Sequence, residues 1–178
     1  HISIDDWHPI AINKNNQYLR IGHAPTHRGV KGTDIILEVL DELTSNGYKF
    51  NIVLVEGLSN EEARKKYEEV DIMIDQLHAG WYGGLAVELM ALGKPVMAYI
   101  REEDLNYIPD EMRNDLPVIK TTHKTLKHDL INLLKMNRED IAKLGWLSRK
   151  YVEKWHNPIE ISKLIRRDYE SAIEKLGY

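Results

Sequence analysis

The sequence predicts an α/β fold, a Rossmann-like parallel sheet of about five strands with helices on both faces. Short apolar runs alternate with helical patterns along most of the chain. The stretch 71–100 reads as strand, glycine-rich loop, helix and strand, which is a βαβ unit. Because the crossovers of such units are right-handed, their helices cover a parallel sheet. Ligands of these sheets bind at the carboxyl ends of the strands.

Length and composition narrow the class of protein. A chain of 178 residues is long enough for one well-buried domain and too short for two ordinary ones. Its net charge of −4 implies neither a polyphosphate nor a membrane partner. With no cysteine, disulfides, thiolate metal sites and a cysteine nucleophile are excluded. The sequence shows no membrane span and no signal peptide, so we expect a cytoplasmic protein.

The expected elements follow from apolar spacing and from turn residues. Residues 1–17 lack periodicity and read as a linker or interdomain segment, and residues 18–178 as the domain. Strands are expected over 18–22, 50–55, 71–75, 96–100 and 117–120. Helices are expected over 33–46, 59–70, 84–92, 125–136, 138–155 and 159–176, with long surface loops over 23–32 and 101–116.

Helix starts are marked by residues that cap the first turn. Thr33 is the expected N-cap of the first helix, and Ser59 or Asn60 that of the second. Asn137 is a good N-cap for the helix that follows it, and Asn157-Pro158 opens the last one.

The glycine-rich loop before residue 85 is suited to a phosphorylated ligand. Gly83 and Gly84 have no side chain, so a ligand can approach the backbone closely. The helix that begins there offers unpaired N–H groups and the positive end of its dipole. Glu88 lies about one turn into the helix, where a carboxylate can accept hydrogen bonds from hydroxyl groups. A phosphate ester joined to a sugar fits both features.

The segment GGLAVELMALGKPV resembles the donor-binding signature of retaining glycosyltransferases with the GT-B fold, of the family-4 or group 1 type. The usual pattern there is Glu-Gly-Phe-Gly-Leu, three residues, then Glu-Ala-Met-Ala-x-Gly-x-Pro-Val. Gly83 matches the loop glycine, Gly84 and Leu85 follow at the helix start, and Glu88 matches the second glutamate. The other matches are Met90, Ala91, Gly93, Pro95 and Val96.

The first glutamate of that signature falls on Gly80, so this carboxylate is absent from the chain. In the family it helps to hold the transferred sugar. His78, two residues earlier, is a candidate to replace it as a catalytic group, although a loop histidine is more often a structural hydrogen-bonding residue.

The loop after the first strand carries two cations, Arg28 and Lys31. Loop cations are usually only solvated, but HRGVKGT resembles the phosphate-binding Arg/Lys site of the same family. The arginine is displaced relative to that pattern, so Lys31 matches it better than Arg28. Both are candidate ligands of a diphosphate, Arg28 through a bidentate contact.

The alternative that is not an enzyme is a ligand-binding αβα module, either a receiver-like domain or a stand-alone binder of a sugar or phosphate. Asp75 would be the phosphate acceptor, and Lys120 ends the fifth strand where such a domain keeps its lysine. A receiver needs an acidic cluster after the first strand to hold Mg²⁺, and this chain has histidines and cations there. Basic residues are scattered along the chain, which argues against a nucleic-acid partner.

The resemblance implies the donor-binding, C-terminal half of a retaining hexosyltransferase-type enzyme. It implies a nucleotide-sugar donor, no cofactor and no metal, and an acceptor-binding N-terminal domain in the same protein.

Because the chain begins with His1 rather than Met, we expect it to be part of a longer protein. We expect the last helix to pack towards the missing half and this chain alone to transfer little or no sugar. Any peripheral membrane association would come through the missing half. A UDP-sugar epimerase of the same fold would use the same pocket.

Overall fold

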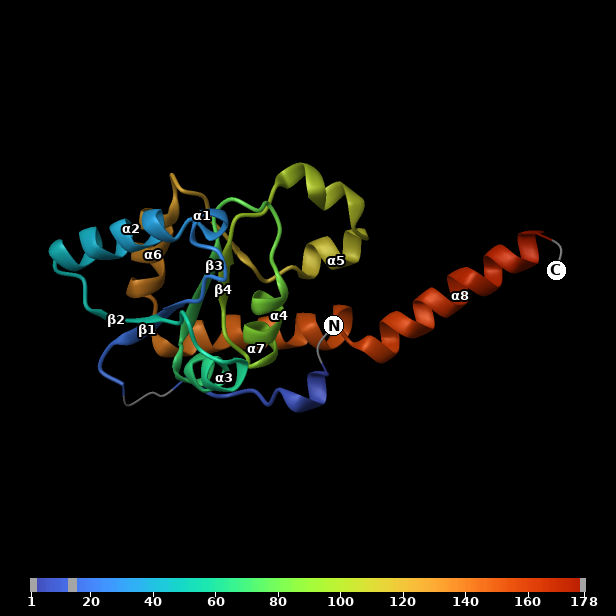
Figure 1. Ribbon diagram of the computed structural model, residues 1–178, viewed down its shortest axis with the longest axis horizontal. Helices are drawn as coiled ribbons and strands as arrows, with labels where there is room; N and C mark the ends of the chain where they lie inside the picture. The colour runs from blue at the N-terminus through green and yellow to red at the C-terminus, as the bar shows by residue number, and fades with distance from the viewer. Residues whose placement is uncertain (1–2, 13–15, 177–178) are drawn as a thin grey trace.

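The computed structural model describes residues 3–12 and 16–176. Its centre is a parallel sheet with the strand order β2-β1-β3-β4-β5 (Figure 1). The strands are β1 (Leu19–His23), β2 (Phe50–Leu54), β3 (Ile72–Gln76), β4 (Val96–Ala98) and β5 (Ile119–Lys120). The predicted α/β class and sheet of five strands are confirmed, with strand ends shifted by one or two residues.

Helices of different length connect the strands and follow the last one. They are α1 (Arg28–Lys31), α2 (Thr33–Ser45), α3 (Asn60–Glu69), α4 (Gly84–Ala91), α5 (Asp110–Asp115), α6 (Leu126–Lys135), α7 (Arg138–Trp155) and α8 (Pro158–Leu176). The described residues also form two short 3₁₀ helices, η1 (Ile4–Asp6) and η2 (Glu102–Tyr107).

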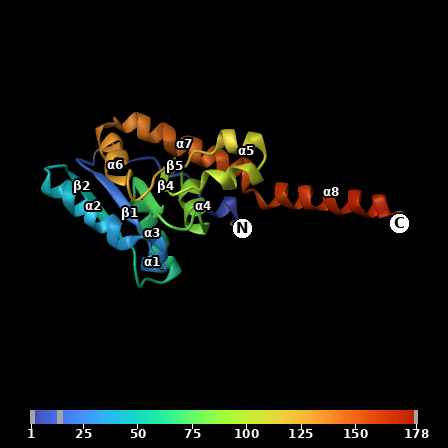
Figure 2. The ribbon, with the colours of Figure 1, turned by 90° about the horizontal axis from the view of Figure 1, so that it is seen from above.

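Apolar side chains on the two faces of the sheet belong to two separate cores. Ile72 and Ile74 of β3 face the core made with α2 and α6, whereas Met73 faces the core made with α3, α4 and α7. This alternation is the two-residue period of a strand. Both faces are therefore covered by helices, as a parallel sheet requires (Figures 1 and 2).

Two segments that the sequence analysis expects to be irregular contain helical turns. The loop over 23–32 holds α1, and the loop over 101–116 holds η2 and α5. Asp110 and Glu111 follow Pro109 and suit the positive end of a helix dipole, a start signal that the prediction overlooked. Thr33 is the first residue of α2 rather than its N-cap, because Gly32 takes that place in the left-handed conformation at φ 73°.

The segment that precedes β1 packs on the domain. Ile4 and Trp7 are buried in the core of α3, α4 and α7, and Ile12 is buried in the other core. The Arg64 guanidinium lies 4.3 Å from the centroid of the Trp7 ring. Residues 1, 2 and 13–15 of the expected linker lie outside the described residues.

The last helix leaves the body of the domain. Figures 1 and 2 both show α8 projecting away from the sheet and its covering helices. None of its residues is buried. Its large apolar side chains are exposed at Ile159, Leu164, Ile165, Tyr169, Ile173 and Leu176.

A close backbone contact fixes α7 against the end of α4. Gly93 follows α4 with φ 72°, and its carbonyl oxygen lies only 2.0 Å from where a Cβ on Gly145 would stand. Residue 145 of α7 must therefore be glycine for the two helices to approach as they do.

Buried charges gather at the amino ends of the central strands, opposite the expected ligand edge. Asp71 accepts a hydrogen bond of 2.8 Å from the Arg20 backbone N–H, and the Arg20 guanidinium lies 3.4 Å from its carboxylate. Arg138 lies 4.0 Å from the same carboxylate. Lys94 is buried beside this group, and its burial lowers its pKa from 10.5 to about 8, against the attraction of Asp71.

The lowered pKa of Lys94 makes the free energy of unfolding depend on pH. Between pH 8 and 10.5 the unfolded chain holds the Lys94 proton and the folded chain has lost it, so stability attributable to Lys94 rises with pH there. We expect urea unfolding at pH 7.5 and 9.5 to show that rise in the wild-type chain relative to Lys94→Met. Lys127→Met, which removes an exposed lysine, serves as the control. Equal pH dependence in the wild type and Lys94→Met would contradict the expectation.

Candidate functional site

The candidate site lies where the direction of strand addition reverses. The chain adds β2 on one side of β1 and β3 on the other, so the carboxyl ends of β1 and β3 flank the switch point of the sheet. Crevices at such points bind ligands in open α/β sheets. The loops after β1 and β3 bring Lys31, at the end of α1, and Gly83, at the start of α4, to this edge.

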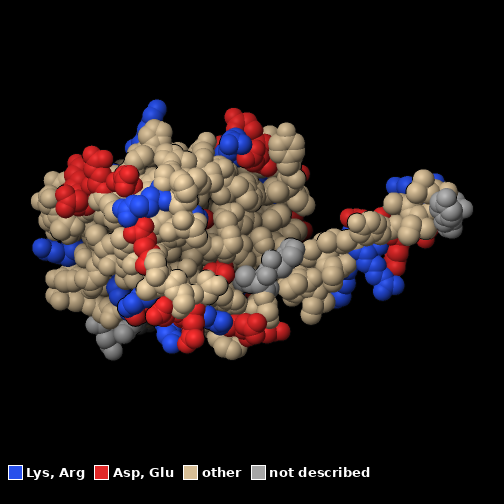
Figure 3. Space-filling view, in the orientation of Figure 1, with Lys and Arg blue, Asp and Glu red and all other residues tan. Residues whose placement is uncertain are grey.

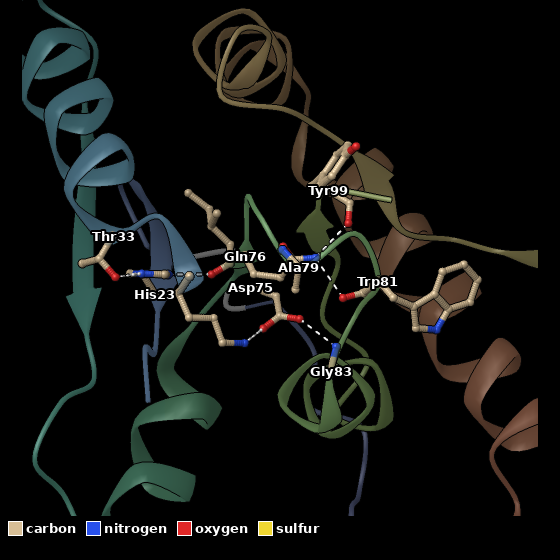
Figure 4. A network of polar contacts seen from close by, with 10 residues as sticks. His23, Thr33, Asp75, Gln76, Ala79, Trp81, Gly83 and Tyr99 are labelled. Atoms are coloured by element: carbon tan, nitrogen blue, oxygen red, sulfur yellow. Dashed lines mark hydrogen bonds and ion pairs between the residues drawn. The ribbon is translucent and has the colours of Figure 1, made fainter. Parts of the chain in front are cut away.

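Asp75 joins these two loops. Its side chain is fully buried, and one carboxylate oxygen pairs with the Lys31 ammonium. The other oxygen accepts a hydrogen bond of 3.0 Å from the Gly83 backbone N–H (Figure 4). The sequence analysis considers Asp75 only as a phosphate acceptor. Its burial and its two bonded oxygens are unsuited to that role, and Lys120 pairs instead with Glu102.

His23, the last residue of β1, cross-links the same edge of the sheet. Its Nδ1 lies 2.8 Å from the Ile74 carbonyl oxygen, which only accepts, so Nδ1 carries the proton. Its Nε2, at 2.9 Å, then accepts from the Thr33 hydroxyl (Figure 4). Burial lowers the pKa of His23, and the positive charge of Lys31 adds to that shift. The neutral ring thus ties the end of β1 to β3 and to the start of α2.

Gln76 shapes the glycine-rich loop. Its amide nitrogen donates to the carbonyl oxygens of Trp81 at 2.9 Å and Tyr99 at 2.8 Å. Its amide oxygen accepts from the Ala79 N–H at 2.7 Å (Figure 4). Neither Gln76 nor His23 is among the predicted site residues. The available signal was that both are polar residues at the carboxyl end of a buried strand.

The amino end of α4 carries the predicted backbone donors. The N–H groups of Gly84 and Leu85 belong to the first turn, where an α-helix supplies no acceptor of its own. The Leu85 side chain packs against the core of α3, α4 and α7. An added Cβ at Gly84 would meet no atom within 4 Å, so the backbone there is open to a ligand.

Glu88 is half-buried on the side of α4 that faces α3. Burial raises the pKa of its carboxyl, and the positive charge of Arg64 opposes that shift. The charge of Glu88 in turn contributes, after burial, to the raised pKa of Tyr67. Glu88 therefore lies on the same helix as the backbone donors, close to Arg64 and Tyr67 of α3.

Arg28 and His78 do not take part in the Lys31–Asp75–Gly83 contacts described above. Arg28 donates to Glu56 at 3.0 and 2.8 Å and lies 3.6 Å from Asp34. His78 is exposed, with Nε2 3.1 Å from a Cβ built on Gly32, and it borders a hollow of about 350 Å³ with Tyr99 and residues 122–124. The structure thus brings together Lys31, Gly83, Gly84 and Leu85, but the predicted Gly83 donor is already bonded to Asp75. Arg28 pairs with Glu56, and His78 lies beside Gly32.

The backbone conformation at position 80 disfavours the missing glutamate. Gly80 adopts φ 82°, which an L-residue with a side chain rarely adopts, and a Cβ there would lie 3.0 Å from the Arg101 guanidinium.

No protein-family model and no curated protein sequence matches the chain, but several solved structures share its fold. The C-terminal domain of a group 1 family glycosyltransferase (LpcC) from Francisella tularensis superposes with a TM-score of 0.60 at 15% identity, over 89% of this chain and 100% of that domain. The chain has the fold of a GT-B C-terminal domain. Sucrose-phosphate synthase from Thermosynechococcus elongatus matches 98% of this chain, with a TM-score of 0.66 and 13% identity. HepE from Anabaena, solved with UDP and glucose, matches 86%, with a TM-score of 0.56 and 14% identity.

The GT-B neighbours are longer proteins in most cases. This chain spans 51% of sucrose-phosphate synthase and 48% of HepE. Among residues 3–12 and 16–176, no helix is both long and apolar enough to cross a bilayer. In the same part of the chain, no cluster of three histidine or acidic side chains is placed to hold a metal ion. On the face drawn in Figure 3, basic and acidic side chains are interspersed.

Proposed function

We propose that this chain binds a nucleotide-sugar donor for a glycosyltransferase that retains the configuration of the transferred sugar. The observation that carries the proposal is the convergence of the Lys31 ammonium and the amino end of α4 at the β1/β3 switch point. A cation and first-turn N–H groups together suit a diphosphate. Structural neighbours of the same fold have been solved with UDP.

The proposed mechanism is electrostatic. Departure of the nucleoside diphosphate builds negative charge, which preorganised donors stabilise most. Lys31 and the N–H groups of Gly84 and Leu85 would contact the phosphate oxygens. Glu88 would accept hydrogen bonds from ribose hydroxyls, which a half-buried carboxylate needs to offset its desolvation. Arg28 is proposed as an outer contact that acts only after a change of rotamer, because its side chain pairs with Glu56. His78, which is exposed beside Gly32, is proposed as a second outer contact. No step in this scheme needs a metal.

The acceptor is proposed to bind to another part of a longer protein. In sucrose-phosphate synthase and HepE, about half of the protein lies outside the part that matches this chain. The exposed apolar side chains of α8 suit packing against that additional part. The present chain would then bind donor and transfer little sugar alone.

Glu88→Ala tests the donor site. Thermal-shift screening of UDP-, GDP- and ADP-sugars selects the ligand, and calorimetric titration then measures its affinity. We expect the substitution to weaken binding about tenfold, since one or two charge-assisted hydrogen bonds to the ribose are lost. Glu42→Ala, an exposed glutamate of α2 paired with Lys127, should leave the affinity unchanged. Equal affinity in Glu88→Ala and the wild type would refute the assignment of Glu88.

A further inference from the structure

Asp75 places a negative charge inside the proposed diphosphate site. Its side chain is 0% exposed, and a Cβ built on Gly83 would lie 3.8 Å from its Oδ2 and 3.9 Å from the Lys31 ammonium nitrogen. Carboxylate and cation thus stand side by side at the start of α4. The Asp75 carboxylate already uses the Gly83 N–H and one of the ammonium hydrogens. An incoming phosphate would share the Lys31 ammonium with it and would take its backbone hydrogen bonds from Gly84 and Leu85.

Two effects of this carboxylate on an anion act in opposite directions. It holds Lys31 and the glycine-rich loop in one arrangement, which favours binding by preorganisation. It also repels a neighbouring anion, and within a partly buried site that repulsion is weakly screened. Lys31 is 14% exposed, and its backbone is held by other contacts: its N–H donates to the His27 carbonyl oxygen at 3.0 Å, and its carbonyl oxygen accepts from the Leu77 N–H at 3.1 Å. Part of the preorganisation therefore does not depend on the charge of Asp75.

We propose that Asp75 is a positioning residue that also limits affinity: it orients Lys31 directly and the start of α4 through Gly83, and its charge keeps the bound diphosphate weakly held. The inference rests on the proposed function. In a transferase of this kind, a weakly held nucleoside diphosphate leaves faster after transfer. If Asp75 had only a structural role, its substitution would weaken the binding of the diphosphate instead of strengthening it.

The test is Asp75→Asn, which removes the charge, keeps the size and leaves one oxygen to accept from either Lys31 or Gly83. Calorimetric titrations use inorganic pyrophosphate and UDP, with folding checked by circular dichroism. We expect both ligands to bind at least tenfold more tightly to Asp75→Asn than to the wild type. Glu42→Gln, which changes the net charge equally at an exposed site, should bind as the wild type does. Unchanged or weaker binding to folded Asp75→Asn would overturn the inference.

A second background keeps the inference testable if the single variant does not fold. Here Lys31→Met is compared with Lys31→Met/Asp75→Asn, and a gain in pyrophosphate affinity is again expected, though smaller, because no ammonium is freed. Absence of any gain overturns the inference.

If UDP binds the wild type and Asp75→Asn equally, the proposed function stands and the inference fails. If UDP binds neither chain but pyrophosphate binds Asp75→Asn more tightly, the inference stands and the nucleotide function fails. If neither ligand binds any variant, both fail.

Discussion

Lys31→Met is expected to lower the free energy of unfolding by roughly 3–5 kcal/mol, the usual cost of leaving a buried charge without its partner. Asp75 would keep only the Gly83 N–H as a donor among the contacts described above, with its side chain fully buried. The same change should weaken UDP binding at least tenfold, because a cation is lost from the proposed diphosphate site. Urea unfolding measures the first effect and calorimetry the second.

Two further variants separate the loss of the ion pair from a general loss of packing. Adding Asp75→Asn to Lys31→Met removes the stranded charge and should restore most of the lost stability. Lys127→Met, at an exposed pair with Glu42, should change stability by less than about 1 kcal/mol. A Lys31→Met chain as stable as the wild type would show that the buried pair contributes no net stability.

Gly145→Ala is expected to destabilise the fold by about 3 kcal/mol or more, at the upper end for overpacked sites. In most helix interiors the same substitution stabilises, by roughly 0.5–1 kcal/mol. Here the new Cβ would stand 2.0 Å from the Gly93 carbonyl oxygen and 3.5 Å from Pro95 Cδ. The helices α7 and α4 would have to separate, which would disturb the start of β4 as well.

The matched control is Lys143→Ala, an exposed position on the same helix. It should leave the urea midpoint nearly unchanged, whereas Gly145→Ala should lower it clearly without changing the slope. If Gly145→Ala were neutral or stabilising, the close approach of α7 to Gly93 would not exist in solution.

Local features of the fold could be predicted from the sequence because their causes lie within a few residues. The Ser59 cap forms a reciprocal capping box with Glu62, and Asn137 accepts from the Asp140 N–H at 2.8 Å. The boundaries of α7 agree with the expected 138–155 for the same reason. The glycine-rich loop and α4 follow from apolar spacing and from Gly93, which ends the helix.

Features that depend on distant parts of the chain could not be predicted in this way. Lys31 and Asp75 are 44 residues apart, and nothing near either residue indicates that they pair. The same holds for the contact of Gly145 with Gly93. Position in the sequence groups Arg28 with Lys31, because both follow β1, but in the structure the Arg28 side chain, at the start of α1, pairs with Glu56, two residues after β2. One helical turn inside an expected loop was enough to separate two neighbouring cations.

The exposed course of α8 has a consequence for how this chain unfolds. A helix with no buried residue gains nothing from either core, so its order depends on backbone hydrogen bonds, on the Asn157 side chain that accepts from Ile159 N–H, and on pairs such as Arg166–Glu170. Most of the stability of a helix in a protein comes from tertiary packing of its apolar face, which α8 lacks here. Melting of α8 would therefore be a local helix–coil transition, uncoupled from the cooperative unfolding of the sheet.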